Sequence, residues 1–274
     1  MRLAFFGDVV GRAGRVALCE RLPELKRQLR LDFIGVNAEN AAGGFGLTES
    51  IANELFDAGA DCLTLGNHAW DQREAIAYID REPRLLRAAN YPPLTMAPGR
   101  GANLFQLGDR NVLVVTVMGR VFMDALDCPF SAVEREVSAS PLGLVADAVI
   151  VEVHGEATSE KQGMGHFLDG RASLVFGTHT HVPSADTRIL PGGTAFQTEL
   201  GMCGDYDSVI GMNKNIAVRK LSSRMPYQRH EPAEGQGLAS GIFVETDDKT
   251  GLAVRAEPIR VGIGLKQAVP LVDG

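Results

Sequence analysis

The sequence has no excess of positive charge, no paired cysteines and no long apolar run, and each absence excludes a class of protein. The formal net charge is −7 and the pI is near 5.4, so we expect no basic stripe that would neutralise the phosphates of long nucleic acid. The four cysteines form no C-x-x-C pair, which predicts neither a zinc ribbon nor a disulfide framework. Without a long apolar run or a secretory leader before Gly7, we expect an unexported cytoplasmic protein with no membrane partner.

Length and composition are those of a protein with a sizeable core. The sequence has 274 residues, of which 45% are apolar, and it shows no repeat, low-complexity segment or long linker. We therefore interpret residues 1–274 as one domain. Short apolar runs alternate with helical periodicity in the first half, and two later pairs of runs are joined by short polar turns. These patterns alone indicate an α/β fold with antiparallel additions.

Local patterns predict where the elements begin and end. Leucines recur at helical spacing from Leu18 to Leu29, but Pro23 should interrupt that helix. Thr48 is expected to cap a second helix. The apolar runs predict strands at Leu3–Phe6, Phe33–Asn37, Cys62–Leu65, Asn103–Leu107, Val112–Met118, Ala148–Val153, Leu174–Gly177, Gly241–Glu245 and Leu252–Pro258.

Three further features concern the second half of the chain. Ser159 and Gln162 have the spacing of a capping box. Residues 200–240, rich in glycine and polar side chains, are expected to cross the surface and to cover a pocket. His166 is interpreted as a packing or surface residue and His230 as a solvent-exposed one, so neither is a candidate site residue.

Polar side chains directly follow several apolar runs. Because open α/β sheets bind ligands outside the carboxyl ends of their strands, these side chains are expected to share one site. His179 and His181 are two residues apart, so in an extended segment both rings would point to one side with attachment points about 7 Å apart. That separation suits two metal ions roughly 3.5–4 Å apart. The candidates are Asp8, Glu39, Asn40, Asn67, His68, His154, His179 and His181.

Each candidate also has a simpler explanation. A single strand-end aspartate such as Asp8 is more often a turn or cap residue, and Asn67 followed by His68 is common in turns. An H-x-H pair can be a hydrogen-bonded pair, and one metal ion held by both rings would leave His154 and Asn67 without a function. Their joint occurrence, each after its own apolar run, indicates a dinuclear metal site.

The same motifs resemble those of the calcineurin-like metallophosphoesterases. That resemblance rests on GDVVG (7–11), NAEN (37–40), GNHAWD (66–71), VHGE (153–156) and GTHTH (177–181). The YmdB-like family of bacterial phosphodiesterases is similar over more of the chain, as in NAENAAGGFG (37–46), MGRVFMDALDCPF (118–130), HGEATSEK (154–161) and YDSVIGM (206–212). The resemblance implies a metallophosphoesterase-type α/β/β/α sandwich, in which two facing mixed sheets are flanked by helices.

The resemblance also implies a role for each candidate. A first metal ion would be held by Asp8, Glu39, Asn40 and His181, and a second by Glu39, Asn67, His154 and His179, with Glu39 bridging. A water or hydroxide between the ions would be the nucleophile. His68 would be catalytic, stabilising charge on the phosphoryl group or protonating the leaving oxygen. The alternative is that His68 only orients a neighbouring side chain.

Two positions depart from the pattern of the broad superfamily. The usual D-x-H of the first strand is Asp8-Val9-Val10 here, and Glu39 stands in place of the bridging aspartate. The YmdB-like family is similar to this sequence in both changes. Asn40 then becomes the substitute oxygen ligand, and the oxygen-rich shell favours iron or manganese over zinc as the cofactor.

We therefore expect a metal-dependent hydrolase of small phosphodiesters, above all 2′,3′-cyclic nucleotides such as 2′,3′-cyclic AMP. The acidic net charge argues against a long nucleic-acid track as a binding surface. Assembly into a homo-oligomer is an open alternative. A phosphomonoesterase or nucleotidase would use the same site, and a regulatory protein could bind a nucleotide or an RNA-processing partner with little turnover. A nicotinamide dehydrogenase is disfavoured because GDVVGRAG (7–14) lacks G-x-G-x-x-G spacing.

Overall fold

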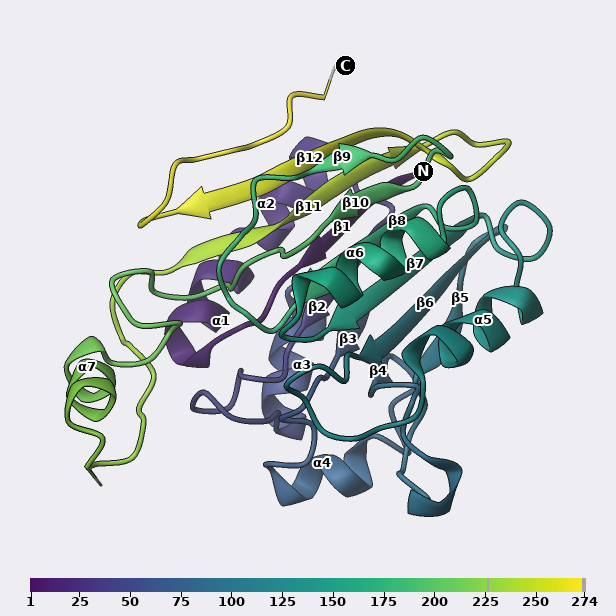
Figure 1. The fold of residues 1–274 in the computed structure, drawn as a ribbon. Coiled ribbons are helices and arrows are strands. Elements are labelled where there is room, and N and C mark those ends of the chain that lie inside the picture. The colour runs from purple at the N-terminus through teal and green to yellow at the C-terminus, as the bar shows by residue number, and fades with distance from the viewer. Residues whose placement is uncertain (226, 273–274) are drawn as a thin grey trace.

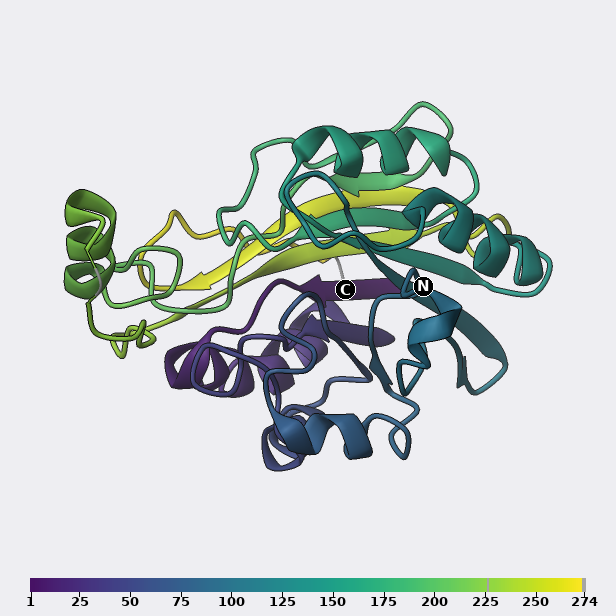
Figure 2. The same cartoon turned by 60° about the horizontal axis from the view of Figure 1, so that its bottom comes forward.

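Two six-stranded sheets lie face to face and carry helices on their outer sides, in a computed structural model that describes residues 1–225 and 227–272 (Figures 1 and 2). The first sheet consists, in spatial order, of β12 (Ala253–Gly262), β11 (Leu238–Thr246), β1 (Arg2–Phe6), β2 (Phe33–Asn37), β3 (Cys62–Thr64) and β4 (Leu85–Leu86). The second consists of β5 (Ala102–Leu107), β6 (Arg110–Met118), β7 (Ala148–His154), β8 (Leu174–Thr178), β10 (Ala195–Gln197) and β9 (Arg188–Ile189). Each sheet contains parallel and antiparallel pairs, so the expected sandwich of two mixed sheets is confirmed.

Helices cover both outer faces. The helices are α1 (Gly11–Cys19), α2 (Leu22–Leu29), α3 (Glu49–Asp57), α4 (Arg73–Tyr78), α5 (Pro129–Ala139), α6 (Thr158–Phe167) and α7 (Lys214–Ser223), with a short 3₁₀ turn at Pro93–Thr95. Leucines of α1, α2 and α3 pack on the first sheet, and apolar residues of α5 and α6 pack on the second. In contrast, α7 stands apart from both sheets at one end of the molecule (Figures 1 and 2).

The alternation of side chains along β1 explains the layering. Leu3 and Phe5 point into the core between the sheets, whereas Ala4 and Phe6 belong to the cluster under the helices. The ring centroid of Phe5 lies 4.4 Å from that of Phe176 on β8, so the two sheets meet through aromatic contact. Both faces of β1 are therefore buried, as its unbroken apolar run requires.

Parallel pairing brings strand ends together. β1, β2, β3 and β4 are parallel neighbours, as are β6, β7, β8 and β10, so the carboxyl ends within each group emerge at one edge. The chain passes very close to itself there, because a Cβ at Gly7 would lie 1.8 Å from the Gly201 carbonyl oxygen. Only glycine fits that crossing, which places the residues after β1 against those before Met202.

Most local expectations are confirmed. The helical leucine pattern is split into α1 and α2, with Pro23 in the first turn of α2, and the Thr48 hydroxyl accepts a hydrogen bond from the Ile51 amide at α3. The prediction of a capping box at Ser159 and Gln162 is wrong. The helix begins one residue before Ser159, at Thr158, with Ala157 at the N-cap position, so Ser159 already lies inside the first turn.

The two hairpins are also confirmed. β5 pairs with β6 and β11 with β12, both antiparallel, and the second hairpin is longer than its apolar runs indicated. Residues 200–240 cross the surface only in part, because residues 200–205 are buried, with Cys203 bridged to Val9, and residues 238–240 belong to β11. The described residues between them, which include α7, are the part that is mainly exposed. Among the described residues, none of the helices is long and apolar enough to cross a membrane.

Candidate metal centre

The candidate ligands come from the carboxyl ends of five strands and from the turns that follow them. Asp8 follows β1, Glu39 and Asn40 follow β2, Asn67 follows β3, His154 ends β7, and His179 and His181 follow β8. Five of these side chains are buried, namely Asp8, Glu39, Asn40, His154 and His181. Burial of so many polar groups in one place needs compensating partners, and their contacts show where those partners are.

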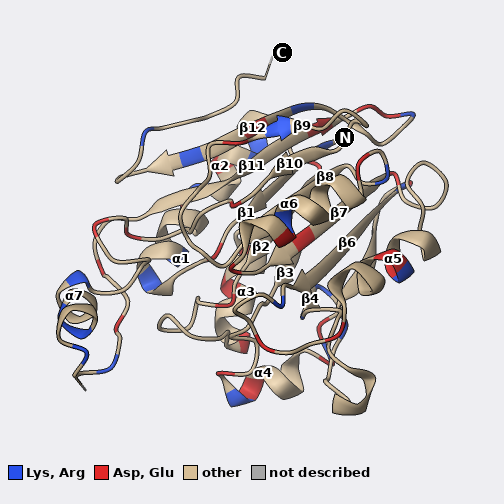
Figure 3. Ribbon diagram, viewed as in Figure 1, with Lys and Arg blue, Asp and Glu red and all other residues tan. Residues whose placement is uncertain are grey.

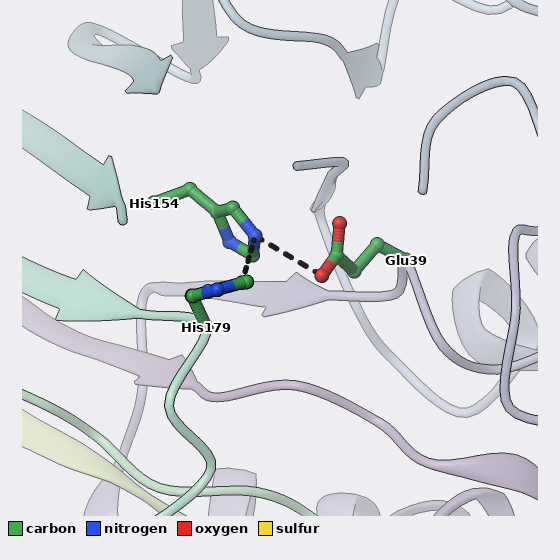
Figure 4. Close-up of side chains that lie close together, drawn as sticks. All are labelled: Glu39, His154 and His179. Carbon is green, nitrogen blue, oxygen red and sulfur yellow. Dashed lines mark hydrogen bonds and ion pairs between the residues drawn. The ribbon is translucent and has the colours of Figure 1, made fainter. Parts of the chain in front are cut away.

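The Nε2 atom of His154 lies at the centre of this cluster. It is 2.9 Å from Asn67 Oδ1, 3.1 Å from Glu39 Oε1 and 3.2 Å from His179 Nδ1. Figure 4 shows the His179 ring and the Glu39 carboxylate both turned toward this nitrogen. A single N–H can serve one of these atoms well, whereas a cation placed among them would be bound by all of them.

A hydrogen-bond relay fixes the opposite side of the His154 ring. The Thr178 hydroxyl donates to Glu152 Oε1 at 2.7 Å and lies 2.9 Å from His154 Nδ1. Because the hydroxyl proton is used toward Glu152, the Thr178 oxygen accepts from Nδ1–H. The lone pair of the neutral ring is then on Nε2 and faces the cluster, the arrangement found for metal-binding histidines.

His181 is held in the same way beside Asp8. Its Nδ1 donates to the Ile210 carbonyl at 2.8 Å, which leaves Nε2 3.9 Å from Asp8 Oδ1. Among the described residues, none gives a hydrogen bond to Asp8 Oδ1 or to Asn40 Oδ1, although both atoms are buried. Buried oxygens of this kind are normally paired, and a cation would supply the missing partner. The donor set therefore fits metal ions.

The pKa shifts show that the cluster attracts positive charge. Burial alone would raise the pKa of Glu39, but the facing His154 ring lowers it to about 2. Burial would lower the pKa of His154, but the Glu39 carboxylate outweighs it and the pKa rises to about 9. Burial raises the pKa of Asp8 to about 6, and burial with the nearby His154 charge lowers that of His179 to about 3. In the metal-free protein, the His154 proton therefore occupies the place of a cation.

The turn that carries the two neighbouring histidines is not extended, so that expectation is wrong. His179 has φ 100° and His181 has φ 65°, both in the left-handed region that residues with side chains rarely adopt. Glu199 holds the turn, because its Oε2 accepts from the Thr180 amide at 3.2 Å and from the Thr180 hydroxyl at 2.8 Å. Lys161, fully buried, contacts the same oxygen at 2.7 Å. Tertiary contacts thus impose a conformation that the local sequence disfavours.

His68 lies at the edge of the cluster. Its amide donates to Glu39 Oε2 at 3.0 Å, and its Nδ1 is 2.7 Å from Asp71 Oδ2. The Phe45 ring meets the His68 ring edge-on with centroids 5.2 Å apart. With Nδ1–H directed to Asp71, Nε2 is the ring nitrogen that remains for a ligand in the adjoining cavity.

That cavity has a volume of about 550 Å³, and its wall combines metal-centre residues with an apolar surface. Val209, Ile210, Met212, Ala217 and Leu221 form the apolar part. His230 and His166 are both exposed as expected, and His230 also lines the cavity, which was not predicted from the sequence. Nothing in the local sequence marks His230, because it reaches the cavity only through the path of residues 200–240. The expected covering role of that segment is confirmed.

Comparison with known proteins agrees with this geometry. The model of a family described as YmdB-like protein matches residues 4–259. A 2′,3′-cyclic-nucleotide 2′-phosphodiesterase of Bacillus subtilis (strain 168) is 42% identical over 267 residues, covering 95% of this chain and 97% of the relative. A crystal structure of a hypothetical protein from Thermus thermophilus has a TM-score of 0.88 at 40% identity, covering 96% of this chain and 99% of that one.

A more distant likeness concerns the fold alone. A putative 5′-nucleotidase from Staphylococcus aureus, crystallised with alpha-ketoglutarate, has a TM-score of 0.58 at 14% identity and covers 100% of this chain and 55% of that chain. The sandwich is thus the metallophosphoesterase fold. The family model spans most of the sequence, and the candidate side chains lie together at the carboxyl ends of the parallel strands. The chain belongs to the YmdB-like family.

Proposed function

We propose that the protein is a metal-dependent hydrolase of small phosphodiesters and that 2′,3′-cyclic nucleotides such as 2′,3′-cyclic AMP are its substrates. The observation that carries this proposal is the convergence of imidazole nitrogens and of carboxylate and amide oxygens beside a cavity of about 550 Å³, where Asp8 Oδ1 and Asn40 Oδ1 are buried without a hydrogen bond from the described residues. The name of the Bacillus subtilis relative supports the cyclic-nucleotide substrate. A cavity with an apolar wall suits a nucleoside next to its phosphate.

Two cations fit the donor set as two overlapping groups. One group is Asp8, Glu39, Asn40 and His181, the other is Glu39, Asn67, His154 and His179, and the Glu39 carboxylate belongs to both. Cations held there would neutralise phosphate charge and lower the pKa of a water molecule. Oxygen donors in each group favour iron or manganese, which we propose as the native metals.

His68 is proposed to act on the leaving oxygen. In hydrolysis, the oxygen of water forms a bond to phosphorus, the bond between phosphorus and one ribose oxygen breaks, and that ribose oxygen gains a proton. His68 lines the cavity, and its Nδ1 contact with Asp71 Oδ2 orients the ring so that Nε2 is left for the leaving oxygen. Protonation of the leaving oxygen in this way avoids a free alkoxide.

The proposal also covers the compartment and the oligomeric state. We place the protein in the cytoplasm, which is supported by four free cysteines, of which Cys62 and Cys203 are buried. Self-association into a homo-oligomer stays a prediction.

The test combines metal analysis with turnover. Purified protein should contain about two transition-metal ions per chain, and hydrolysis of 2′,3′-cyclic AMP should stop after chelation and return with manganese or iron. The product, a nucleoside monophosphate, should be cleaved much more slowly than the cyclic diester. Absence of bound metal together with failed reconstitution would overturn the proposal, and faster cleavage of the monoester would make the protein a phosphomonoesterase.

A variant isolates the role of His68. His68→Ala should keep the metal content but lower kcat about 10²- to 10⁴-fold, the range for loss of general acid catalysis. His166→Ala, at an exposed histidine of α6, is the matched control and should behave as the unmodified protein does. Normal turnover in His68→Ala at full metal content would leave His68 with an orienting role only.

A further inference from the structure

The cavity has a positively charged outer side that the acidic composition conceals. Residues 214–230, which we call the basic segment, comprise α7 and the chain that follows it. They contain five Lys or Arg residues and no Asp or Glu, in a sequence with 34 acidic and 27 basic residues. Figure 3 shows this basic colour on α7 and beyond it, at the end of the molecule where α7 projects. A local polyanion site is therefore compatible with a net charge of −7.

We propose that the basic segment binds the phosphates of a short RNA strand whose 3′ end, a 2′,3′-cyclic phosphate, lies in the metal centre. This inference rests on the proposed function and extends it from mononucleotides to RNA ends. Lys220 and His230 line the same cavity as His179 and His181, so the basic segment extends from the cavity wall beside the metal centre to the outside. RNA is specified because a 2′,3′-cyclic phosphate requires the ribose 2′ oxygen.

The cations of the segment differ in their availability. Lys214 forms an ion pair with Asp207. In the described part of the chain, no carboxylate lies within 4.0 Å of the charged atoms of Lys220, Arg224 or Arg229. Exposed cations without a carboxylate partner bind phosphates without first breaking an ion pair. These three residues are the proposed backbone contacts.

An aromatic side chain of the basic segment contacts another of its cations, Arg219. The Arg219 guanidinium carbon is 4.2 Å from the centroid of the Tyr227 ring, and Arg219 Nη1 donates to the Tyr227 hydroxyl at 3.3 Å. Tyr227 is 42% exposed. A ring held in this way offers a face for base stacking, and proteins that bind single strands combine such rings with basic grooves. The pair thus fits a base with its adjacent phosphate.

The exposed apolar residues of the basic segment suggest an anionic membrane as an alternative partner. Val218 and Met225 are exposed, and a basic helix with such residues also occurs at anionic membranes. RNA is favoured because Lys220 and His230 border a cavity that already belongs to a phosphodiesterase-type centre. A membrane surface would contact the segment without any relation to the cavity.

The proposed reaction at an RNA end is the same hydrolysis. Water supplies the oxygen that bonds to phosphorus, one ribose–phosphorus bond breaks, the ribose oxygen takes a proton, and the RNA keeps a linear terminal phosphate. The experiment compares kcat/KM for 2′,3′-cyclic AMP with kcat/KM for a short RNA ending in a 2′,3′-cyclic phosphate, as a function of salt. The RNA should be the better substrate by about tenfold or more at low salt, and its advantage should shrink as salt rises.

The decisive variant is Arg224→Gln/Arg229→Gln, which removes two exposed charges. It should lower the ratio of RNA to mononucleotide kcat/KM about tenfold and reduce the logarithmic salt slope by roughly 1.4, as expected for two phosphate contacts on a single strand. Arg27→Gln/Arg73→Gln, at exposed positions on α2 and α4, removes the same charge and should change neither quantity. Equal ratios in the two double variants would overturn the proposal.

Binding measurements separate this proposal from the proposed function. Fluorescence anisotropy with the same RNA does not require turnover, so it decides the RNA surface even if 2′,3′-cyclic AMP is not cleaved and the proposed function fails. Weaker binding by Arg224→Gln/Arg229→Gln than by the control would support the RNA surface, and equal binding would overturn it. Binding to phosphatidylserine vesicles that is lost in the variant, without any effect on RNA, would assign the segment to a membrane instead.

Discussion

The inner and outer sides of the cavity are built differently. Behind the inner wall, His154 and Asp8 are fully buried, and each contacts a side chain that follows or ends another strand. On the outer side, the basic segment is one helix and a connection, and Val218 and Leu221 of α7 are more than half exposed. Buried polar contacts therefore fix the positions of the candidate ligands, whereas the side chains of the outer surface can adjust to a bound ligand.

The largest expected contrast is in activity. Glu39→Gln removes the carboxylate that faces His154 and belongs to both groups of donors, so we expect kcat for 2′,3′-cyclic AMP to fall about a thousandfold, with loss of bound metal. Elemental analysis and initial rates measure the two effects. Arg27→Gln, at an exposed arginine of α2, is the control. Retention of both metal and turnover in Glu39→Gln would show that the inner side is not the reacting centre.

The two sides should also differ in how much the free energy of unfolding falls when one partner of an ion pair is removed. Lys161→Met leaves the buried Glu199 carboxylate without its cation and should lower the free energy of unfolding by about 3–5 kcal/mol. Lys214→Met breaks the exposed pair with Asp207 and should cost about 0–1 kcal/mol. Urea unfolding followed by circular dichroism measures both values. Similar losses for the two variants would contradict the contrast between buried and exposed sides.

Removal of bound metal by a chelator should make the stability of the protein depend on pH through the titration of His154. The pKa of His154 is about 9 in the folded metal-free protein and 6.5 for the free side chain, so its contribution is complete below about pH 6.5 and is lost as the pH rises through 9. Asp8, with a pKa of about 6, is already ionised above pH 7 and does not contribute to that change.

The measurement is the Tm between pH 7 and pH 9 with and without a chelator. The Tm of the chelated protein should fall over this interval, and the metal-loaded protein should change less because a cation stands in for the proton. An identical pH dependence in both forms would show that no cation binds beside His154.

The smallest effect is expected for apolar truncations on the outer side. Val218→Ala should change the free energy of unfolding by less than about 0.5 kcal/mol, because this side chain is exposed on α7. Val151→Ala, at a fully buried position of β7, should cost about 2 kcal/mol. A large loss for Val218→Ala would mean that a second molecule covers α7 in solution, which analytical ultracentrifugation would detect.

Much of the inner side was predictable because parallel strands end at a common edge. Asp8, Glu39 and His154 each follow or end an apolar run. Residues at the carboxyl ends of parallel strands lie at one edge of a sheet, so their proximity could be predicted from the sequence. The contacts of His154 with Glu39, Asn67 and His179 agree with that placement. Their roles as ligands stay a prediction that metal analysis will test.

Other parts of the site were not predictable from local sequence. The left-handed backbone of His179 and His181 depends on Glu199, which lies beyond β9 and β10 in the chain. Lys161 is a charged residue of α6, yet it is buried beside Glu199. Long-range partners decide such conformations, and a single sequence gives no pairing information.

By itself, the pattern of residues determined an α/β fold with antiparallel additions and polar side chains at the ends of its apolar runs, because both are local properties, and the resemblance to a known family implied the second sheet. Only the tertiary structure decided which nitrogen of each histidine faces the cluster, since that depends on Thr178 and on the Ile210 carbonyl. It also decided that the basic segment borders the cavity, because the path of residues 200–240 brings Lys220 and His230 beside His181.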